Sequence, residues 1–184
     1  EWNRIVERFE IICRTAHEKD VLLLIDAEES WMQDAADDLV LDMMRKYNKD
    51  KCIVFNTAQT YRWDRFDFVK NTHAIGLREG FHVGFKVVRG AYMEKERERA
   101  QEKGYPSPIC ATKAQTDATF NKTVTYMVEN LENKIALFAG THNEESSYML
   151  MELMRKNNIP HTDKRIWFGQ LYGMSDNISY NLSH

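Results

Sequence analysis

The feature that most constrains the fold of this chain is a repeated unit, in which a short apolar stretch is followed by an amphipathic helical stretch. The repeat predicts five buried strands, at residues 21–27, 52–57, 83–88, 135–139 and 165–168 with its continuation. Nearly continuous apolar strands that alternate with helices are typical of a parallel sheet covered by helices. The sequence therefore predicts an α/β fold.

The stretches between the strands carry apolar residues at helical spacing, which places those residues on one face. We expect these faces to form the core. They contain Ile5, Phe9, Ile12, Cys13 and Ala16; Ala36, Val40 and Met43 in a helix from about residue 30 to 47; Phe66, Val69, Ala74 and Leu77; Phe120, Val124, Met127, Val128 and Leu131; and Leu150, Leu153 and Met154.

Two parallel architectures fit this pattern. A doubly wound sheet that binds a dinucleotide usually has the motif GxGxxG after its first strand, and the sequence contains no such motif. A TIM-like barrel needs no glycine motif and places chemistry at the C-terminal ends of its strands. A complete eight-unit barrel takes at least about 200 residues, so 184 residues with five units predict a single domain, residues 1–184, that forms a partial barrel.

Composition excludes several function classes. The net charge is −3 with both signs interspersed, so nucleic acid is not an expected partner. The three cysteines form no CxxC pair, which argues against a disulfide framework or a zinc site. No apolar run reaches the roughly 20 residues that cross a bilayer.

The first and third strands end in residues that can carry chemistry. By alternation, Asp26 points into the barrel mouth with Glu28 beyond it, although acidic residues here could simply begin the next helix. In the third strand, Lys86 and Tyr92 share one face and Arg89 lies on the other. An apolar strand should be buried, so each cation needs an acceptor, and Arg89 could pair with an outer carboxylate.

The other strand ends offer amides, hydroxyls and an imidazole. Gln59 suits a flavin or nucleobase ring, or equally a tie between two loops. Thr141, His142 and Asn143 could hold phosphate or ribityl oxygens at a helix N-terminus, or Thr141 or Asn143 could be the N-cap. Gln170 ends the fifth strand in the same way.

A metal-dependent lyase is an alternative reading of these strand ends. Asp26, Glu28 and His142 could together bind a metal ion, but ligands on separate strands have no diagnostic spacing. We therefore predict no metal site.

Six motifs in order resemble the proline dehydrogenase family, more closely its monofunctional eukaryotic mitochondrial form, over nearly the whole chain. The motifs are LLLIDAEESWMQDA from Leu22, IVFNTAQTY from Ile53, GFKVVRGAYMEKERERA from Gly84, GYPSPI from Gly104, THNEES from Thr141 and FGQLYGMSD from Phe168. The resemblance implies a distorted (β/α)8 barrel that holds FAD without a dinucleotide motif. It also implies oxidation of L-proline to Δ1-pyrroline-5-carboxylate, with electrons passed to ubiquinone.

The resemblance assigns residues to roles. Asp26, Lys86 and Tyr92 are expected to be catalytic, and Asp26, Tyr92 and Leu171 to bind the substrate. The expected flavin contacts are Gln59, Lys86, Ala91, Met93, Lys113, Thr141, His142, Asn143 and Gln170. The family also implies a mitochondrial location, on the matrix side of the inner membrane with peripheral association.

The resemblance has two departures. Lys86 stands where bacterial relatives have an arginine, so the charge is kept without a bidentate contact. The paired arginines that hold the substrate carboxylate in the family follow the last barrel strands and are expected outside these residues, as is an early lysine. The chain is then a middle portion of the catalytic barrel. The alternative is a non-catalytic barrel fragment without flavin.

Overall fold

The computed structural model of the chain describes residues 1–183 and contains one curled sheet of five parallel strands. The strands are β1 (Leu23–Leu24), β2 (Val54–Gln59), β3 (Val83–Val88), β4 (Ile135–Gly140) and β5 (Ile166–Gly169). Each strand pairs with the next one in the chain, in the order β1-β2-β3-β4-β5. This sequential parallel order is that of a barrel wall, and it confirms the predicted partial barrel of five units.

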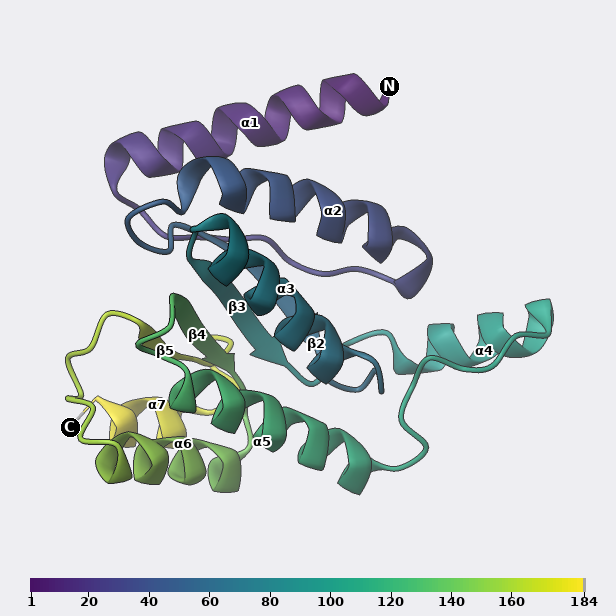
Figure 1. The fold of residues 1–184 in the computed structure, drawn as a ribbon. Helices are drawn as coiled ribbons and strands as arrows, with labels where there is room; N and C mark the ends of the chain where they lie inside the picture. Colours follow the sequence, from purple (N-terminus) through teal and green to yellow (C-terminus); the bar gives the residue numbers. More distant parts are fainter. Residues whose placement is uncertain (184) are drawn as a thin grey trace.

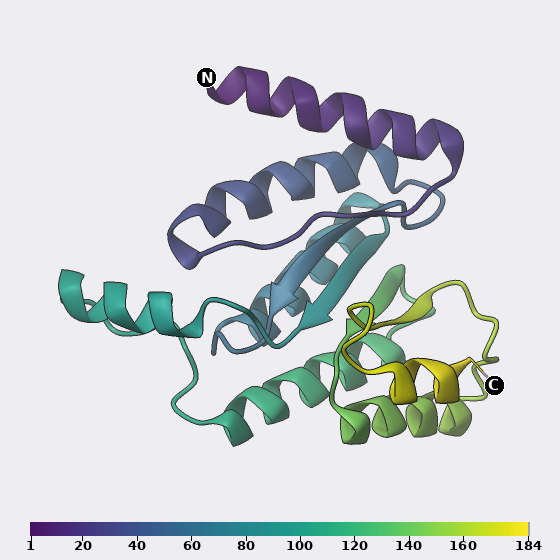
Figure 2. The ribbon, with the colours of Figure 1, turned by 180° about the vertical axis from the view of Figure 1, so that it is seen from behind.

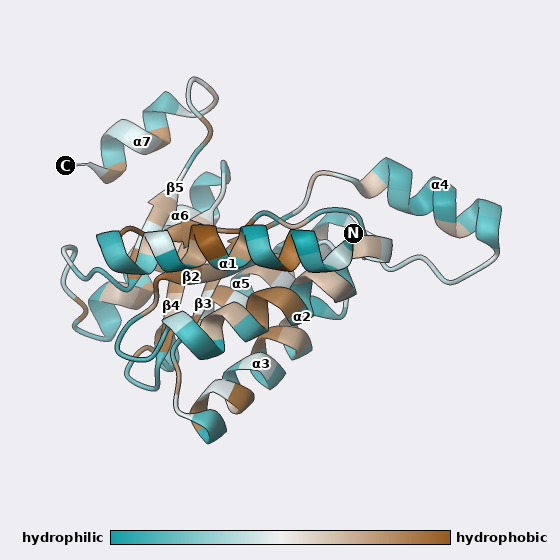
Figure 3. Cartoon of the chain, turned by 90° about the horizontal axis from the view of Figure 1, so that it is seen from above, coloured by the Kyte–Doolittle hydropathy of each residue, from teal (hydrophilic) through white to brown (hydrophobic). Residues whose placement is uncertain are grey.

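Helices cover one face of this sheet. They are α1 (Trp2–Lys19), α2 (Ser30–Tyr47), α3 (Arg65–Glu79), α5 (Lys113–Glu129) and α6 (Glu144–Lys156), and two further helices are α4 (Met93–Lys103) and α7 (Asp176–Leu182). Helix α4 extends away from the body of the molecule (Figures 1 and 2), and it is hydrophilic along almost its whole length (Figure 3). No helix within residues 1–183 is long and apolar enough to span a bilayer.

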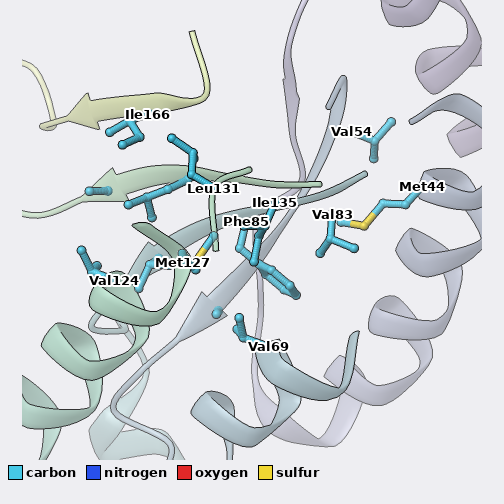
Figure 4. Close-up of a cluster of buried hydrophobic side chains, with 14 of the residues drawn as sticks. Met44, Val54, Val69, Val83, Phe85, Val124, Met127, Leu131, Ile135 and Ile166 are labelled. Carbon is cyan, nitrogen blue, oxygen red and sulfur yellow. The ribbon is translucent and has the colours of Figure 1, made fainter. Parts of the chain in front are cut away.

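The main core lies between the sheet and the helices (Figure 4). Phe85 and Val87 of β3 point into it and are fully buried. The predicted face of α5 is confirmed, because its four residues in the helix are buried, and Leu131, just after the helix, is buried as well. The α2 boundaries, Ser30–Tyr47, also agree with the prediction.

Two predicted helix faces are partly wrong. Ile5 and Ile12 in α1 are 38% and 53% exposed, because this helix buries only Cys13 fully, with Phe9 and Ala16 packed partly against the core. In α3, Ala74 and Leu77 are exposed, because the buried face runs through Thr72, His73 and Gly76 instead. His73 is buried with hydrogen bonds to the Tyr126 hydroxyl and the Asn133 carbonyl oxygen, a pairing that a hydrophobicity pattern cannot reveal.

The predicted first strand, residues 21–27, is much shorter in the structure. Only Leu23 and Leu24 pair with β2, although the Ile25 N–H also donates to the Phe55 carbonyl oxygen. The strand lies at the edge of the sheet and Val21 is exposed. Its extended conformation therefore continues past the point where pairing stops, toward Asp26.

The other, concave face of the sheet is built in layers set by the strand register. Leu24, Phe55, Gly84 and Ala136 form the lowest layer, Thr57, Lys86, Phe138 and Trp167 the next, and Gln59, Val88, Gly140 and Gly169 the uppermost. A Cβ atom on Gly84 would lie 2.7 Å from the Phe55 ring, so the lowest layer needs glycine there. Polar residues enter only above this apolar floor.

Candidate functional site

Lys86, in the second half of β3, and Asp26, two residues after β1, meet on the concave face. The Lys86 ammonium nitrogen contacts Asp26 Oδ1. The Lys86 side chain is 17% exposed and that of Asp26 is 73% exposed. Lys86, which was predicted to need an acceptor, therefore has one in Asp26. This carboxylate lies on the other side of β2 and is open to solvent.

Tyr92 joins the same group through Glu28. Its hydroxyl donates a hydrogen bond of 2.8 Å to Glu28 Oε2, and this bond raises the pKa of Tyr92, with smaller contributions from burial and from nearby carboxylates. Tyr92 therefore stays protonated as a donor at neutral pH. Tyr92 is also the N-cap residue of α4, so the position of that helix sets the position of its ring.

Gln59 is buried and uses both ends of its amide to tie two loops. Its Nε2 donates to the Glu28 carbonyl oxygen at 2.7 Å, and its Oε1 accepts from the Ala91 N–H at 3.4 Å. The predicted structural role is thus confirmed. The other hydrogen on Nε2 donates no hydrogen bond within residues 1–183, so it is available to a ligand, and a flavin contact stays a prediction.

Arg89 lies on the helix side of the sheet, as its parity predicts. Its guanidinium donates to Asp117 at 2.6 Å, to Thr141 Oγ1 at 2.9 Å and to Ser146 Oγ at 3.0 Å, and it stacks on the Phe120 ring. The predicted pairing of Arg89 with an outer carboxylate is confirmed.

Lys113, at the start of α5, shares that carboxylate. Its Nζ donates to Asp117 Oδ2 at 2.6 Å. Desolvation alone would raise the pKa of Asp117, but the hydrogen bonds from Lys113 and Arg89 outweigh it and hold the pKa below its usual range. Asp117 is therefore an anion that links the third strand end to α5.

The predicted residues of β4 and β5 form a second group. Asn143 is the N-cap of α6, since its Oδ1 accepts the Ser146 N–H at 2.8 Å, which confirms one of the two alternatives. His142 Nδ1 is 2.8 Å from Ser175 Oγ, and its Nε2 is 3.4 Å from the Leu171 backbone nitrogen. Gln170 donates to the Thr141 carbonyl oxygen at 3.3 Å.

His142 is not joined to the carboxylates of the first strand end by these contacts. Asp26 contacts Lys86, Glu28 accepts from Tyr92, and His142 contacts residues of the β5 loop. Within residues 1–183, no three His, Cys, Asp or Glu side chains lie close enough to hold a metal ion.

A cleft of about 890 Å³ opens beside the first group, between the start of α4 and the start of α5. Four of the predicted residues line it: Ala91, Tyr92, Met93 and Lys113. Its volume lies within the range of about 300–1,000 Å³ usual for small-molecule sites. The predicted residues therefore lie in three places: at the ends of the first three strands, at the ends of β4 and β5, and in the cleft. Tyr92 belongs to both the first place and the cleft, because it contacts Glu28 and also lines the cleft.

Cations dominate the charged lining of the cleft. Arg89, Lys95, Arg97 and Lys113 line it, against the single carboxylate of Glu94. The backbone N–H groups at the start of α5 add a further positive end, where Thr112 and Gln115 form a capping box. Asp117 pairs with Arg89 and Lys113, and Glu29 pairs with Lys95, so the surroundings of the cleft keep only a small excess of positive charge.

The family comparison is consistent with this arrangement. The family model described as Proline dehydrogenase matches residues 4–184. The chain belongs to the proline dehydrogenase family.

Two curated proline dehydrogenases and one further relative illustrate the similarity. The chain is 37% identical to proline dehydrogenase 1, mitochondrial, of Homo sapiens, with 99% of this chain and 31% of that protein covered. It is 36% identical to the Drosophila melanogaster protein of the same name, with 98% of this chain and 28% of that protein covered. It is 39% identical to the carbapenem antibiotics biosynthesis protein CarD of Pectobacterium carotovorum, with 98% of this chain and 46% of that protein covered. The chain therefore spans less than half of these proteins.

A solved structure supports the fold. Proline utilization A from Bdellovibrio bacteriovorus, inactivated by N-propargylglycine, matches with a TM-score of 0.90 over 98% of this chain and 19% of that one, at 24% identity. At this identity the likeness concerns the fold alone. It agrees with a curled wall of five βα units from the proline dehydrogenase barrel.

Several residues of this candidate site were missed by sequence reasoning. Tyr61 lines the cleft, and its hydroxyl is buried without a hydrogen-bond partner among residues 1–183; burial is the main reason that its pKa rises to about 12. Glu96 of α4 is fully buried and accepts the Ser30 N–H at 2.5 Å and the Ser30 hydroxyl at 2.7 Å. The spacing of Tyr92, Lys95 and Glu96 on one helix face was the available signal, since all three meet residues 28–30.

Proposed function

We propose that this chain is the part of an FAD-dependent proline dehydrogenase that meets both the flavin and the proline ring. The whole protein then oxidises L-proline to Δ1-pyrroline-5-carboxylate, and residues 1–184 form one domain, a portion of its FAD-binding barrel. The observation that carries this proposal is the Lys86–Asp26 pair on the concave face of a proline dehydrogenase-type sheet. Barrel enzymes place their chemistry at this end of the strands.

The residues of the cleft fit a flavin dinucleotide. Its cationic lining and the start of α5 match the charge of a pyrophosphate, and Lys113 lies where both meet. The Tyr61 hydroxyl, which is buried and has no hydrogen-bond partner among residues 1–183, is a further donor at the inner wall of the same cleft. We assign Gln59, Ala91, Met93, Lys113, Thr141, His142, Asn143 and Gln170, with Lys86, to flavin binding.

Bound FAD would supply the hydride acceptor. Lys86 then provides a fixed positive charge where negative charge develops during the reaction, and Asp26 holds the ammonium group in place. Because the Lys86 side chain is mostly buried, its charge is less screened than that of a surface lysine. This role needs a cation that is oriented yet accessible.

Tyr92 and Asp26 would position the substrate. The Tyr92 hydroxyl is directed by Glu28, so its ring has a set orientation beside the mouth of the barrel. Leu171, which is 66% exposed here, provides an apolar surface for the opposite side of the proline ring. The proposal thus assigns binding and orientation to these three side chains.

We further propose ubiquinone as the electron acceptor and the matrix side of the mitochondrial inner membrane as the location, with peripheral association. The mitochondrial relatives from Homo sapiens and Drosophila melanogaster support a mitochondrial protein. The net charge of −3 gives no reason to add nucleic acid as a partner.

Anaerobic titration of the purified full-length protein tests the proposal. We expect a yellow protein whose flavin absorbance bleaches on addition of L-proline, with D-proline as the control. An unchanged flavin spectrum after L-proline would overturn the function, and a protein that binds no flavin saturably would instead be a non-catalytic barrel.

A further inference from the structure

A buried amide links the substrate end of the site to the interior of the molecule. Gln33, in α2, is 2% exposed. Its Oε1 accepts the backbone N–H of Glu28 at 2.9 Å, and its Nε2 donates to Asp37 Oδ1 at 2.8 Å. Glutamine is suited to this place because it carries an acceptor and a donor on one rigid group.

The inner end of the link is anchored by Asp37. This carboxylate, 7% exposed, also accepts from Asn56 Nδ2 and from Arg65 Nη1, each at 2.8 Å. Asn56 belongs to β2 and Arg65 to α3, so three elements converge on one buried anion. Loss of any one partner would leave a buried polar group unpaired. The free-energy cost of that loss holds the network in a single arrangement.

The outer end of the link is Glu28. Its N–H is held by Gln33, its carbonyl oxygen accepts from Gln59 at 2.7 Å, and its carboxylate accepts the Tyr92 hydroxyl at 2.8 Å. The two backbone contacts fix the place from which the Glu28 side chain starts, and the Tyr92 hydroxyl meets its carboxylate. The link from Asp37 to Tyr92 therefore runs through the two hydrogen bonds of Gln33, the covalent side chain of Glu28 and the hydrogen bond that Tyr92 donates.

We propose that Gln33 is a positioning residue, which transmits the fixed position of Asp37 to Glu28 and so orients Tyr92 toward the substrate. The inference rests on the proposed function, because it takes Tyr92 as a substrate contact. Gln33 itself touches neither substrate nor cofactor in this assignment. Its contribution is confined to the orientation of the Glu28 carboxylate.

The first test measures the kinetics of the full-length Gln33→Met variant, which keeps the size of the side chain and removes both hydrogen bonds. Loss of this orientation should raise the KM for L-proline about 5- to 10-fold, with kcat changed less than about twofold, as expected for the loss of one or two hydrogen bonds. In a Tyr92→Phe background the same change should alter KM less than about twofold, because the hydrogen bond between Tyr92 and Glu28 is already absent. An unchanged KM in the single variant, or a full effect in the Tyr92→Phe background, would overturn the proposal.

Asn48→Ala is the matched control. Asn48 is also buried and makes four hydrogen bonds, to Ile53, Val54 and His82, at the opposite end of the sheet. We expect a lower Tm with an unchanged KM for proline. If KM rises equally in Asn48→Ala and Gln33→Met at matched loss of Tm, Gln33 contributes stability alone and the inference fails.

Hydrogen exchange provides a readout independent of proline and flavin. In Gln33→Met, the Glu28 amide should exchange at least about tenfold faster than in the wild-type protein, while β2 amides keep their rates. An unchanged rate at Glu28 overturns the positioning link. If the wild-type protein shows no reduction by proline, the proposed function fails, and the exchange rates still decide whether Gln33 holds Glu28.

Discussion

Two cations three residues apart, Lys86 and Arg89, show how the two faces of one sheet differ. Arg89, on the helix side, donates to three partners and stacks on an aromatic ring. Lys86, on the concave side, has one charged partner, Asp26, which is itself largely exposed. A cation whose donors are used within the fold supports structure, whereas a cation with one accessible partner keeps donors for a ligand.

Phe85 and Trp167, one aromatic residue from each face, show a similar contrast, although Phe55 in the lowest concave layer is also buried. Phe85 on the helix side is fully buried in the main core. Trp167, in the Lys86 layer of the concave face, is 40% exposed. The main core therefore lies on the helix side, and the concave side is open above its buried floor of Phe55 and Ala136.

The largest expected effect is on the helix side. Phe85→Ala should lower the free energy of unfolding by about 3–5 kcal/mol, because it leaves a cavity in a close-packed core. Urea denaturation would measure this, with Trp167→Ala as the control at about 1 kcal/mol or less. Equal losses in the two variants would show that the faces do not differ in burial, and would break the comparison.

The next effect is on the concave side and concerns activity. Lys86→Met should slow flavin reduction by L-proline about 100-fold, a loss typical of removing one electrostatic stabiliser. The free energy of unfolding should change by less than about 1 kcal/mol, since the Asp26 partner is exposed. Stopped-flow absorbance gives the rate, and Lys103→Met, a lysine at the end of α4, is the matched control that should leave it unchanged. A normal rate in Lys86→Met would remove this residue from the catalytic group.

Arg89→Met is the counterpart of that variant. It should lower the free energy of unfolding by about 2 kcal/mol, because Thr141 and Ser146 lose a charged donor and Asp117 keeps only Lys113. Urea denaturation measures the change, and Arg89→Lys should recover part of it. Full stability combined with a lost reaction would mean that Arg89 acts on the site instead of bracing the helices.

The smallest effect is a pH dependence on the helix side. The folded-state pKa of Asp117 is lowered, so its contribution to stability is present above its ordinary pKa of 3.8 and is lost as pH falls through the folded value. Between about pH 5 and 3, the wild-type protein should lose up to about 1 kcal/mol more stability than Asp117→Asn. Urea denaturation across this range measures the difference, and parallel curves for the two proteins would show that the ion pairs of Asp117 contribute nothing.

Much of the fold could be predicted because its signals are local. The alternation of β3 placed Lys86 and Arg89 on opposite faces, and the structure agrees. The periodicity of α2 and α5 gave correct helix faces, because their buried residues are apolar or regularly spaced. In α3 the prediction was partly wrong, because its buried face includes His73 and Thr72, whose burial depends on partners elsewhere.

The candidate site, like the fold, was predicted from the sequence only in part. Asp26, Gln59, Lys86 and Tyr92 were predicted from their places at strand ends. In the structure Asp26 contacts Lys86, and Gln59 and Tyr92 both contact Glu28. Gln33 and Tyr61 were missed, because a polar residue within a helix or loop has no local sign of burial. Glu96 was missed although its spacing from Tyr92 and Lys95 places the three on one helix face.

The sequence by itself determined the order of strands and helices, the face on which each strand residue lies, and membership in the proline dehydrogenase family. Only the tertiary structure decided that Lys86 meets Asp26, 60 residues earlier in the chain, and that Gln33 holds Glu28 above Tyr92. The physical reason is that a parallel sheet brings distant strand ends together through its register and the packing of its crossover helices. Alternation sets the direction of a side chain, but only this packing determines what it touches.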